Sequence, residues 1–312
     1  MWYFYKKFQN DNLENLINQI NAIFGSIFTH EAYEYQPWME GIKLKADFEE
    51  FRAVYELSTE GEKEKLGRAF EHNTKIESIC NLEVEPVTYS DLLLNVSQEF
   101  NRCIEKLKCI QDYLYDNLLK LKGLEDSVGT LKSYYDEFYD SAIEYVCPFC
   151  GLGTMLTSKD DFREAFDHYL PRSKYPFVSL LRENLFPICH TCNSTYKGNA
   201  DPRIFGKFFY PFSTKPNDCE LKFSIVAGVI EHTDIVSDLF IDEIQTWDEL
   251  LDIKDRITNF ADININGWVS NVQEAMRNYN VEYEFAISTE IKGCTPEMQD
   301  HKFVKKAVLK AL

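Results

Sequence analysis

Four cysteines constrain this chain more than any other feature of its sequence. They form two pairs, Cys147–Cys150 and Cys189–Cys192, and in each pair two residues separate the cysteines. This spacing brings two thiolates onto one ion, and two such pairs complete the tetrahedral shell of a structural zinc. The alternatives are a redox pair or buried free thiols. A redox-active cysteine pair usually occurs next to a βαβ pattern, and the flanking sequence lacks this pattern. The spacing therefore predicts a structural zinc site.

The rest of the chain reads as a folded protein without membrane spans. Its 312 residues are 45% hydrophobic and 27% charged, which argues against disorder. No apolar run approaches the roughly 20 residues of a membrane-spanning helix, and the N-terminus is unlike a signal peptide. We therefore expect a cytoplasmic protein. The other cysteines occur singly in apolar patterns and are expected in the core; they are Cys80, Cys103, Cys109, Cys219 and Cys294.

Hydrophobic periodicity predicts an α+β fold in which a mainly helical chain carries a central zinc-stabilised module. Residues 1–143 are expected to be helical, with a long helix that opens at Ser90, whereas residues 30–88 give no clear pattern. The module is expected over 144–214. An α+β region over 215–312 follows, in which alternation from Leu221 to Ile225 predicts a strand, and Thr246 with Glu249 predicts a capping box at the start of the next helix.

Four short elements occur in order around the cysteine pairs. After the first pair come Asp167-His168-Tyr169-Leu170-Pro171 and then Asn184-Leu185; the second pair is followed at once by Asn193 and then by Lys197-Gly198. Singly, each element is usually structural, since an Asp-His pair is most often part of a surface loop. Together and in this order they closely resemble the HNH endonuclease family. The resemblance covers roughly residues 144–200 and implies a ββα-metal module.

The residue types suit cleavage of a phosphodiester. His168 is the candidate general base, because imidazole titrates near neutral pH. Asp167 and Asn193 offer oxygen ligands, which suit a catalytic Mg²⁺ or Mn²⁺ ion that acts as a Lewis acid. The resemblance implies that Asn184 is a catalytic-site residue that holds the loop carrying the base. His190 lies inside the second cysteine pair and is expected to be exposed to solvent.

Two positions depart from the common form of the family. Asn193 stands where many members have a histidine, which keeps an oxygen ligand and favours Mg²⁺. The residues after Pro171 include Arg172 and Lys174 in place of a glycine pair. These two cations can contact phosphate in a nucleic acid, but solvated loop charge is an equal alternative. Lys197, one helical turn after Asn193, is the better candidate for a phosphate contact.

Charge separates the module from its flanks. The chain has 51 acidic against 33 basic residues, a net charge of −18, whereas residues 141–214 are nearly balanced. Acidic flanks repel nucleic acid, so we expect a partner to supply basic surface or to restrain the free protein. The chain more narrowly resembles PtuB, the nuclease subunit of Septu-type antiphage systems. That resemblance implies a PtuA-like ATPase partner and, in some systems, a retron reverse transcriptase with its non-coding RNA.

Two function classes follow from these observations. The first is a metal-dependent endonuclease, an effector subunit of a bacterial antiphage complex, that cleaves DNA or a tRNA or other RNA. The second is a zinc-stabilised adaptor that binds nucleic acid or a partner without cleaving. The presence of Asp167, His168, Asn184 and Asn193 together favours the endonuclease, because an adaptor needs none of them. The helices of the flanks either dock a partner or pack on one another.

Overall fold

The protein is mainly helical with two small antiparallel sheets. The computed structural model describes residues 1–6, 11–40, 42–117, 131–141, 146–157, 159–160, 164–179, 181–292 and 301–312. The chain divides into two compact units. Unit 1 comprises residues 1–6, 139–165 and 188–312, and unit 2 comprises residues 7–138 and 166–187. The range 144–214 therefore contributes residues to both units.

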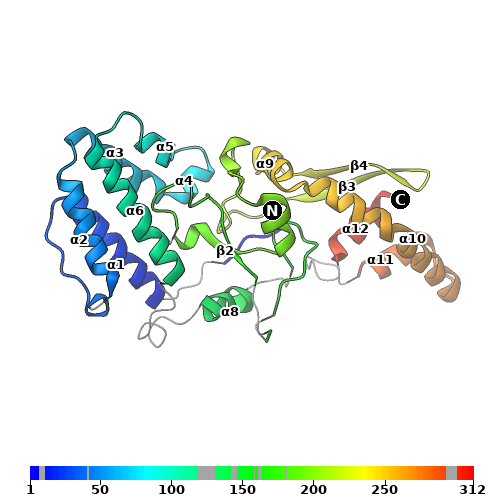
Figure 1. Cartoon of the computed structure of the whole chain (residues 1–312). Helices are drawn as coiled ribbons and strands as arrows, with labels where there is room; N and C mark the ends of the chain where they lie inside the picture. The colour runs from blue at the N-terminus through cyan, green and yellow to red at the C-terminus, as the bar shows by residue number, and fades with distance from the viewer. Residues whose placement is uncertain are drawn as a thin grey trace. The chain divides into compact units, whose positions relative to one another are not determined.

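Unit 2 is built mainly from helices of the N-terminal half (Figure 1). The long ones are α1 (Asp11–Phe28), α2 (Lys43–Glu56), α3 (Glu60–Asn73) and α6 (Gln98–Asn117). Shorter helices are α4 (Ile76–Cys80), α5 (Tyr89–Leu92) and Pro37–Met39; α8 (Leu131–Ser141) crosses the unit boundary. The region 30–88, which showed no clear pattern, thus contains α2, α3 and α4.

One hydrophobic core joins the four long helices with α5 and Pro37–Met39. The apolar stripe of α6 is buried, including Phe100, Leu107 and Ile110, and it packs against α2. Phe177, far along the chain, enters the same core, where its ring centroid lies 5.2 Å from that of Phe24. Aromatic rings bury large apolar areas, so this contact fastens the segment 166–187 to the helices.

The long helix begins later than the sequence predicted. Ser90 lies in the short helix α5, and the chain then turns at Asn95, whose φ of 54° is left-handed. The helix α6 starts only at Gln98, where the Ser97 hydroxyl accepts a hydrogen bond from the Phe100 N–H over 3.1 Å. The apolar spacing continues across this break, which is why periodicity alone placed the start too early.

The first sheet lies in unit 2 and consists of two short strands. Strand β1 (Phe166–His168) pairs antiparallel with β2 (Leu185–Pro187), so that Asp167 faces Phe186 in the register. The ring of Phe166 packs 5.2 Å from Tyr134 and 6.0 Å from Phe138 on α8. A short helix, Arg182–Asn184, leads directly into β2.

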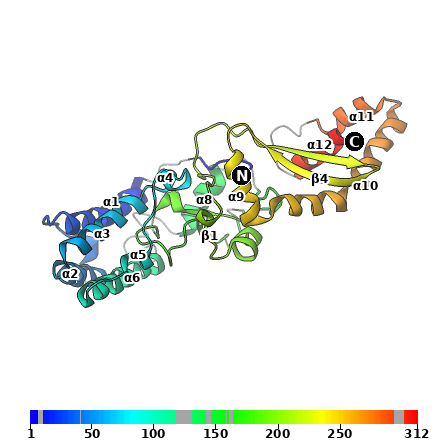
Figure 2. The ribbon, with the colours of Figure 1, turned by 90° about the horizontal axis from the view of Figure 1, so that it is seen from above.

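Unit 1 contains the second sheet and the C-terminal helices. Strands β3 (Glu220–Val226) and β4 (Val229–Val236) form a hairpin that turns at Gly228, with φ of 79°. Helices α10 (Ile253–Tyr279) and α12 (Lys302–Ala311) pack against this hairpin (Figure 2). The remaining helices are α9 (Ile241–Leu251), α11 (Tyr283–Glu290) and the short Thr191–Lys197 and Pro202–Ile204.

Several expectations for this region need correction. The strand at Leu221–Ile225 is present, but a second strand precedes the next helix. Thr246 and Glu249 do not cap a helix, because they lie inside α9, which starts at Ile241.

Cys109 is exposed on α6 rather than buried, whereas Cys80 and Cys103 are buried and Cys219 is half-buried. Cys294 lies outside the described residues.

Within the part of the chain that the structure describes, no helix has both the length and the apolar character needed to cross a bilayer.

Candidate metal centre and nuclease motif

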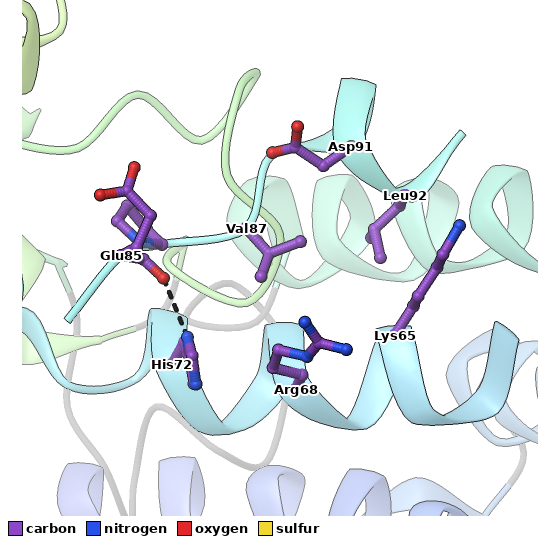
Figure 3. A pocket seen from close by; sticks show the side chains of 8 residues that line it. Lys65, Arg68, His72, Glu85, Val87, Asp91 and Leu92 are labelled. Atoms are coloured by element: carbon purple, nitrogen blue, oxygen red, sulfur yellow. Dashed lines mark hydrogen bonds between the residues drawn. The ribbon is translucent and has the colours of Figure 1, made fainter. Parts of the chain in front are cut away.

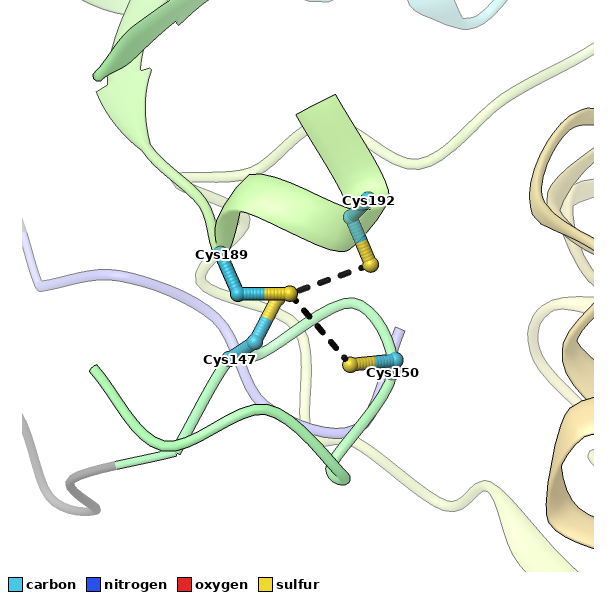
Figure 4. Close-up of side chains that lie close together, drawn as sticks. All are labelled: Cys147, Cys150, Cys189 and Cys192. Atoms are coloured by element: carbon cyan, nitrogen blue, oxygen red, sulfur yellow. Dashed lines mark hydrogen bonds between the residues drawn. The ribbon is translucent and has the colours of Figure 1, made fainter. Parts of the chain in front are cut away.

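The two cysteine pairs converge on one buried point in unit 1 (Figure 4). The four sulfur atoms lie within 4.8 Å of one another. Sγ of Cys147 is 3.9 Å from Sγ of Cys192, and Sγ of Cys150 is 3.8 Å from Sγ of Cys189. Zinc–sulfur bonds of about 2.3 Å in a tetrahedron place the sulfurs about 3.8 Å apart. The arrangement can therefore hold one zinc ion.

Backbone geometry supports the first cysteine pair. The N–H groups of Leu152 and Gly153 donate to Sγ of Cys150 over 3.4 and 3.3 Å, and Gly151 has a left-handed φ of 67°. Gly153 also packs closely, because a Cβ there would lie 2.7 Å from Sγ of Cys189. Burial raises the pKa of the Cys147 thiol well above its usual range, so a metal ion must displace that proton on binding.

A charged residue from outside the motif borders the cluster. Nη1 of Arg256, on α10, donates to Sγ of Cys192 over 3.4 Å and to the Leu251 carbonyl over 3.1 Å. Its guanidinium lies 4.2 Å from the ring centroid of Tyr196. A four-thiolate zinc site carries two net negative charges, so a nearby cation stabilises it. No local sequence signal marked Arg256, which is 64 positions from Cys192.

Other parts of unit 1 fasten to the cysteine loops. The backbone N–H of Trp2 donates to the Pro148 carbonyl over 2.8 Å. Nε2 of His301, at the start of α12, donates to the Leu152 carbonyl over 2.8 Å. The cysteine cluster therefore lies where the first residues of the chain and its last helix meet.

His168, the candidate base, lies at the end of β1 in unit 2 and is half-buried. Its Nε2 lies 3.1 Å from the Ser179 carbonyl oxygen. A carbonyl only accepts hydrogen bonds, so Nε2 carries the proton and, in the neutral ring, the lone pair is on Nδ1. This tautomer makes Nδ1 the atom that can take a proton from water.

Asn184 is fully buried and holds the chain on both sides of the segment after His168. Its Oδ1 accepts from the Leu170 N–H over 2.7 Å, while its Nδ2 donates to the carbonyls of Leu170 and Val178, both over 3.1 Å. The side chain thus uses both ends of its amide on backbone groups. This geometry suits a residue that holds a loop rather than one that binds a metal ion.

The two proposed ligands of a catalytic ion belong to different compact units. Asp167 is buried on β1 in unit 2, and Asn193 is half-buried on the helix Thr191–Lys197 in unit 1. Their carboxylate and amide oxygens are suitable donors for Mg²⁺ or Mn²⁺. Among the described residues, the cysteine cluster is the one group of three or more His, Cys, Asp or Glu side chains near enough to share an ion.

The three basic residues that were expected to contact phosphate differ in their exposure and in their partners. Arg172 forms an ion pair with Asp112 and lies 4.3 Å over the ring of Tyr115. Lys174 is half-exposed, with its Nζ 5.2 Å from the ring of Tyr175. Lys197 is buried in unit 1, with 3% of its surface exposed, and His190 is exposed as expected.

A separate cavity of about 410 Å³ lies beside α3 in unit 2 (Figure 3). Lys65, Arg68 and His72 line it from one face of that helix, with His72 bonded to the Glu85 carbonyl over 2.9 Å. The other lining residues are Glu85, Pro86, Val87, Asp91 and Leu92. Two carboxylates offset the two permanent cations, so the cavity lacks the concentrated positive potential of a phosphate site.

Comparison with known proteins gives one partial similarity. The chain is 36% identical over 87 residues to "Protein ea31" of Escherichia phage lambda. The aligned part is 28% of this chain and 25% of that protein, so the similarity concerns a fragment of each. No protein-family model matches the sequence, and no solved structure matches the chain.

Proposed function

We propose that the protein is a metal-dependent endonuclease of the HNH type that hydrolyses phosphodiester bonds in nucleic acid. The observation that carries the proposal is the state of His168, whose Nε2 is bonded to a backbone carbonyl so that Nδ1 can act as a base. The segment that follows this histidine is held by Asn184. The order of the motif around the four-cysteine cluster adds support from the sequence.

In this proposal each residue has a defined task. His168 takes a proton from the attacking water through Nδ1 and passes it to solvent after the reaction. Asp167 and Asn193 are each candidates to bind a divalent ion through a side-chain oxygen, and such an ion would supply Lewis-acid stabilisation of phosphate charge. Asn184 keeps the backbone from Leu170 to Val178 in place. The four cysteines would bind a structural zinc that stabilises the fold of unit 1.

Activity and its dependence on the base are tested together. The purified protein is incubated with single- and double-stranded DNA and with tRNA, in Mg²⁺, in Mn²⁺ and in EDTA. We expect cleavage that EDTA abolishes and that His168→Ala lowers at least about a hundredfold. His190→Ala is the matched control, since this exposed histidine should leave cleavage near the unaltered level. Metal-dependent binding without cleavage would support the adaptor instead.

The proposed metal ligands require a different test. Asp167→Ala and Asn193→Ala should fail by weaker ion binding, so excess Mn²⁺ should restore part of their activity but none of that of His168→Ala. Equal rescue of all three variants would contradict this division of roles. The motif chemistry can act on any accessible phosphodiester, so these residues do not identify the substrate. Sequencing the cleavage products formed in cells would identify it.

The proposal extends to an antiphage complex with an ATPase, on the strength of the resemblance to PtuB-type nucleases. The acidic flanks support a partner that supplies basic surface, since the net charge of −18 disfavours binding of nucleic acid by the free chain. The protein is expressed together with the neighbouring genes of its operon, purified, and analysed by size-exclusion chromatography to test whether an ATPase co-elutes with it. A monomer that never co-elutes with an ATPase and cleaves freely alone would contradict it.

A further inference from the structure

A tyrosine from the N-terminal helices contacts the candidate base. The ring of Tyr115, on α6, lies 4.8 Å from the imidazole of His168 between centroids, and the two planes are inclined by 57°. Both residues belong to unit 2. Tyr115 lies 53 positions before His168 in the chain, outside the range that resembles the HNH family, and the tyrosine is 38% exposed.

Tyr115 is itself braced by a charged pair. The guanidinium of Arg172 lies 4.3 Å from the centre of its ring, and the same guanidinium forms an ion pair with Asp112. Asp112 and Tyr115 are three residues apart on α6, so both lie on one face of the helix. Arg172 comes four residues after His168. The cluster of Asp112, Tyr115 and Arg172 therefore joins α6 to the segment that carries the base.

Two contacts of His168 act on different parts of its ring. The bond from Nε2 to the Ser179 carbonyl sets the direction of one ring atom. The ring of Tyr115 contacts the flank of the imidazole and restricts rotation of the ring plane. Misplacement of a base by about 1 Å can slow a reaction by two orders of magnitude.

We infer that Tyr115 is a positioning residue for His168, which it holds through its ring and not through its hydroxyl group, while Asp112 and Arg172 hold Tyr115. The inference rests on the proposed endonuclease activity and deepens it: α6, a helix of the N-terminal half, supplies part of the catalytic machinery. Arg172 is then a structural brace that already has two partners, rather than a cation reserved for phosphate.

The test compares Tyr115→Leu with the conservative Tyr115→Phe in the full-length chain. Tyr115→Leu should lower kcat about tenfold or more while KM changes by less than about twofold, because the base is misplaced but substrate binding is retained. Tyr115→Phe keeps the ring and should remain within about twofold of the unaltered protein. Tyr279→Leu removes an exposed tyrosine of α10 and serves as the control.

A second readout is independent of turnover. The ring protons of His168 should show a ring-current shift in NMR spectra that disappears in Tyr115→Leu and persists in Tyr115→Phe. Unchanged kcat in Tyr115→Leu, an effect on KM alone, or equal losses in both variants would overturn the inference while leaving the proposed activity intact. If neither the unaltered protein nor Tyr279→Leu cleaves nucleic acid with any divalent metal, the proposed activity itself fails.

Discussion

Arg256 donates a hydrogen bond to the sulfur of Cys192 across 3.4 Å, which joins helix α10 to the cysteine cluster. Polar groups that surround metal ligands typically change metal affinity by about 10- to 100-fold. Arg256→Leu should therefore speed zinc loss to a chelator by about tenfold or more. Release can be followed with a chromogenic dye, with Arg277→Leu, at an exposed position of the same helix, as the control. Equal rates of zinc release in both variants would show that Arg256 does not stabilise the bound metal.

The cluster should bind one zinc per chain as part of its fold. Elemental analysis is expected to find one equivalent of zinc, and its removal should unfold unit 1, because metal-binding energy is also folding energy in such sites. Cys189→Ser should lose the metal and the cooperative thermal transition. Cys109→Ser, at an exposed cysteine, should retain both. A stable Cys189→Ser protein with unchanged melting would contradict a structural metal.

Gly153 should tolerate no side chain. A Cβ at this position would meet Sγ of Cys189 at 2.7 Å and its Cβ at 2.8 Å, so Gly153→Ala must displace a metal ligand or the loop. We expect weaker zinc retention and a lower melting temperature. Gly267→Ala, in α10, meets nothing within 4 Å and should be neutral or stabilising. The contrast fails if both substitutions have the same effect on metal retention.

Asn184 should contribute to stability independently of catalysis. Asn184→Ala leaves a buried N–H and two carbonyls without their amide partner, and each such group costs about 1–3 kcal/mol. Urea unfolding should show a loss of at least about 2 kcal/mol. Asn101→Ala, at an exposed site of α6, should stay within about 0.5 kcal/mol. Similar midpoints for the two variants would mean that the loop does not depend on Asn184.

Local signals account for what the sequence predicted well. The cysteine spacing predicted the cluster, and alternation from Leu221 predicted β3. Two further local signals mark helix starts: Thr59 with Glu62, and Thr88 with Asp91, form capping boxes at the starts of α3 and α5. The first of them lies in the region 30–88, which lacked a clear pattern.

Contacts between distant segments had no such signal. Arg256 contacts Cys192, and Tyr115 contacts His168, only after the chain has folded. No spacing rule in the sequence therefore identifies either residue. Strand β4 was missed because its apolar residues stand in adjacent pairs at its two ends, Val229-Ile230 and Ile235-Val236, so no alternation marks it. The early start assigned to α6 failed for a related reason, since a left-handed residue at Asn95 interrupts the helix without interrupting its apolar stripe.

The cysteine pairs bracket the segment that carries both His168 and Asn184. Cys150 and Cys189 are 39 positions apart, and the chain between them enters unit 2 before it returns. A metal ion on the four thiolates would close this excursion into a loop with fixed ends. Closure entropy grows slowly, by about 0.6 kcal/mol for each doubling of loop length. The number of residues between the two cysteine pairs is therefore only weakly constrained by closure of the metal site.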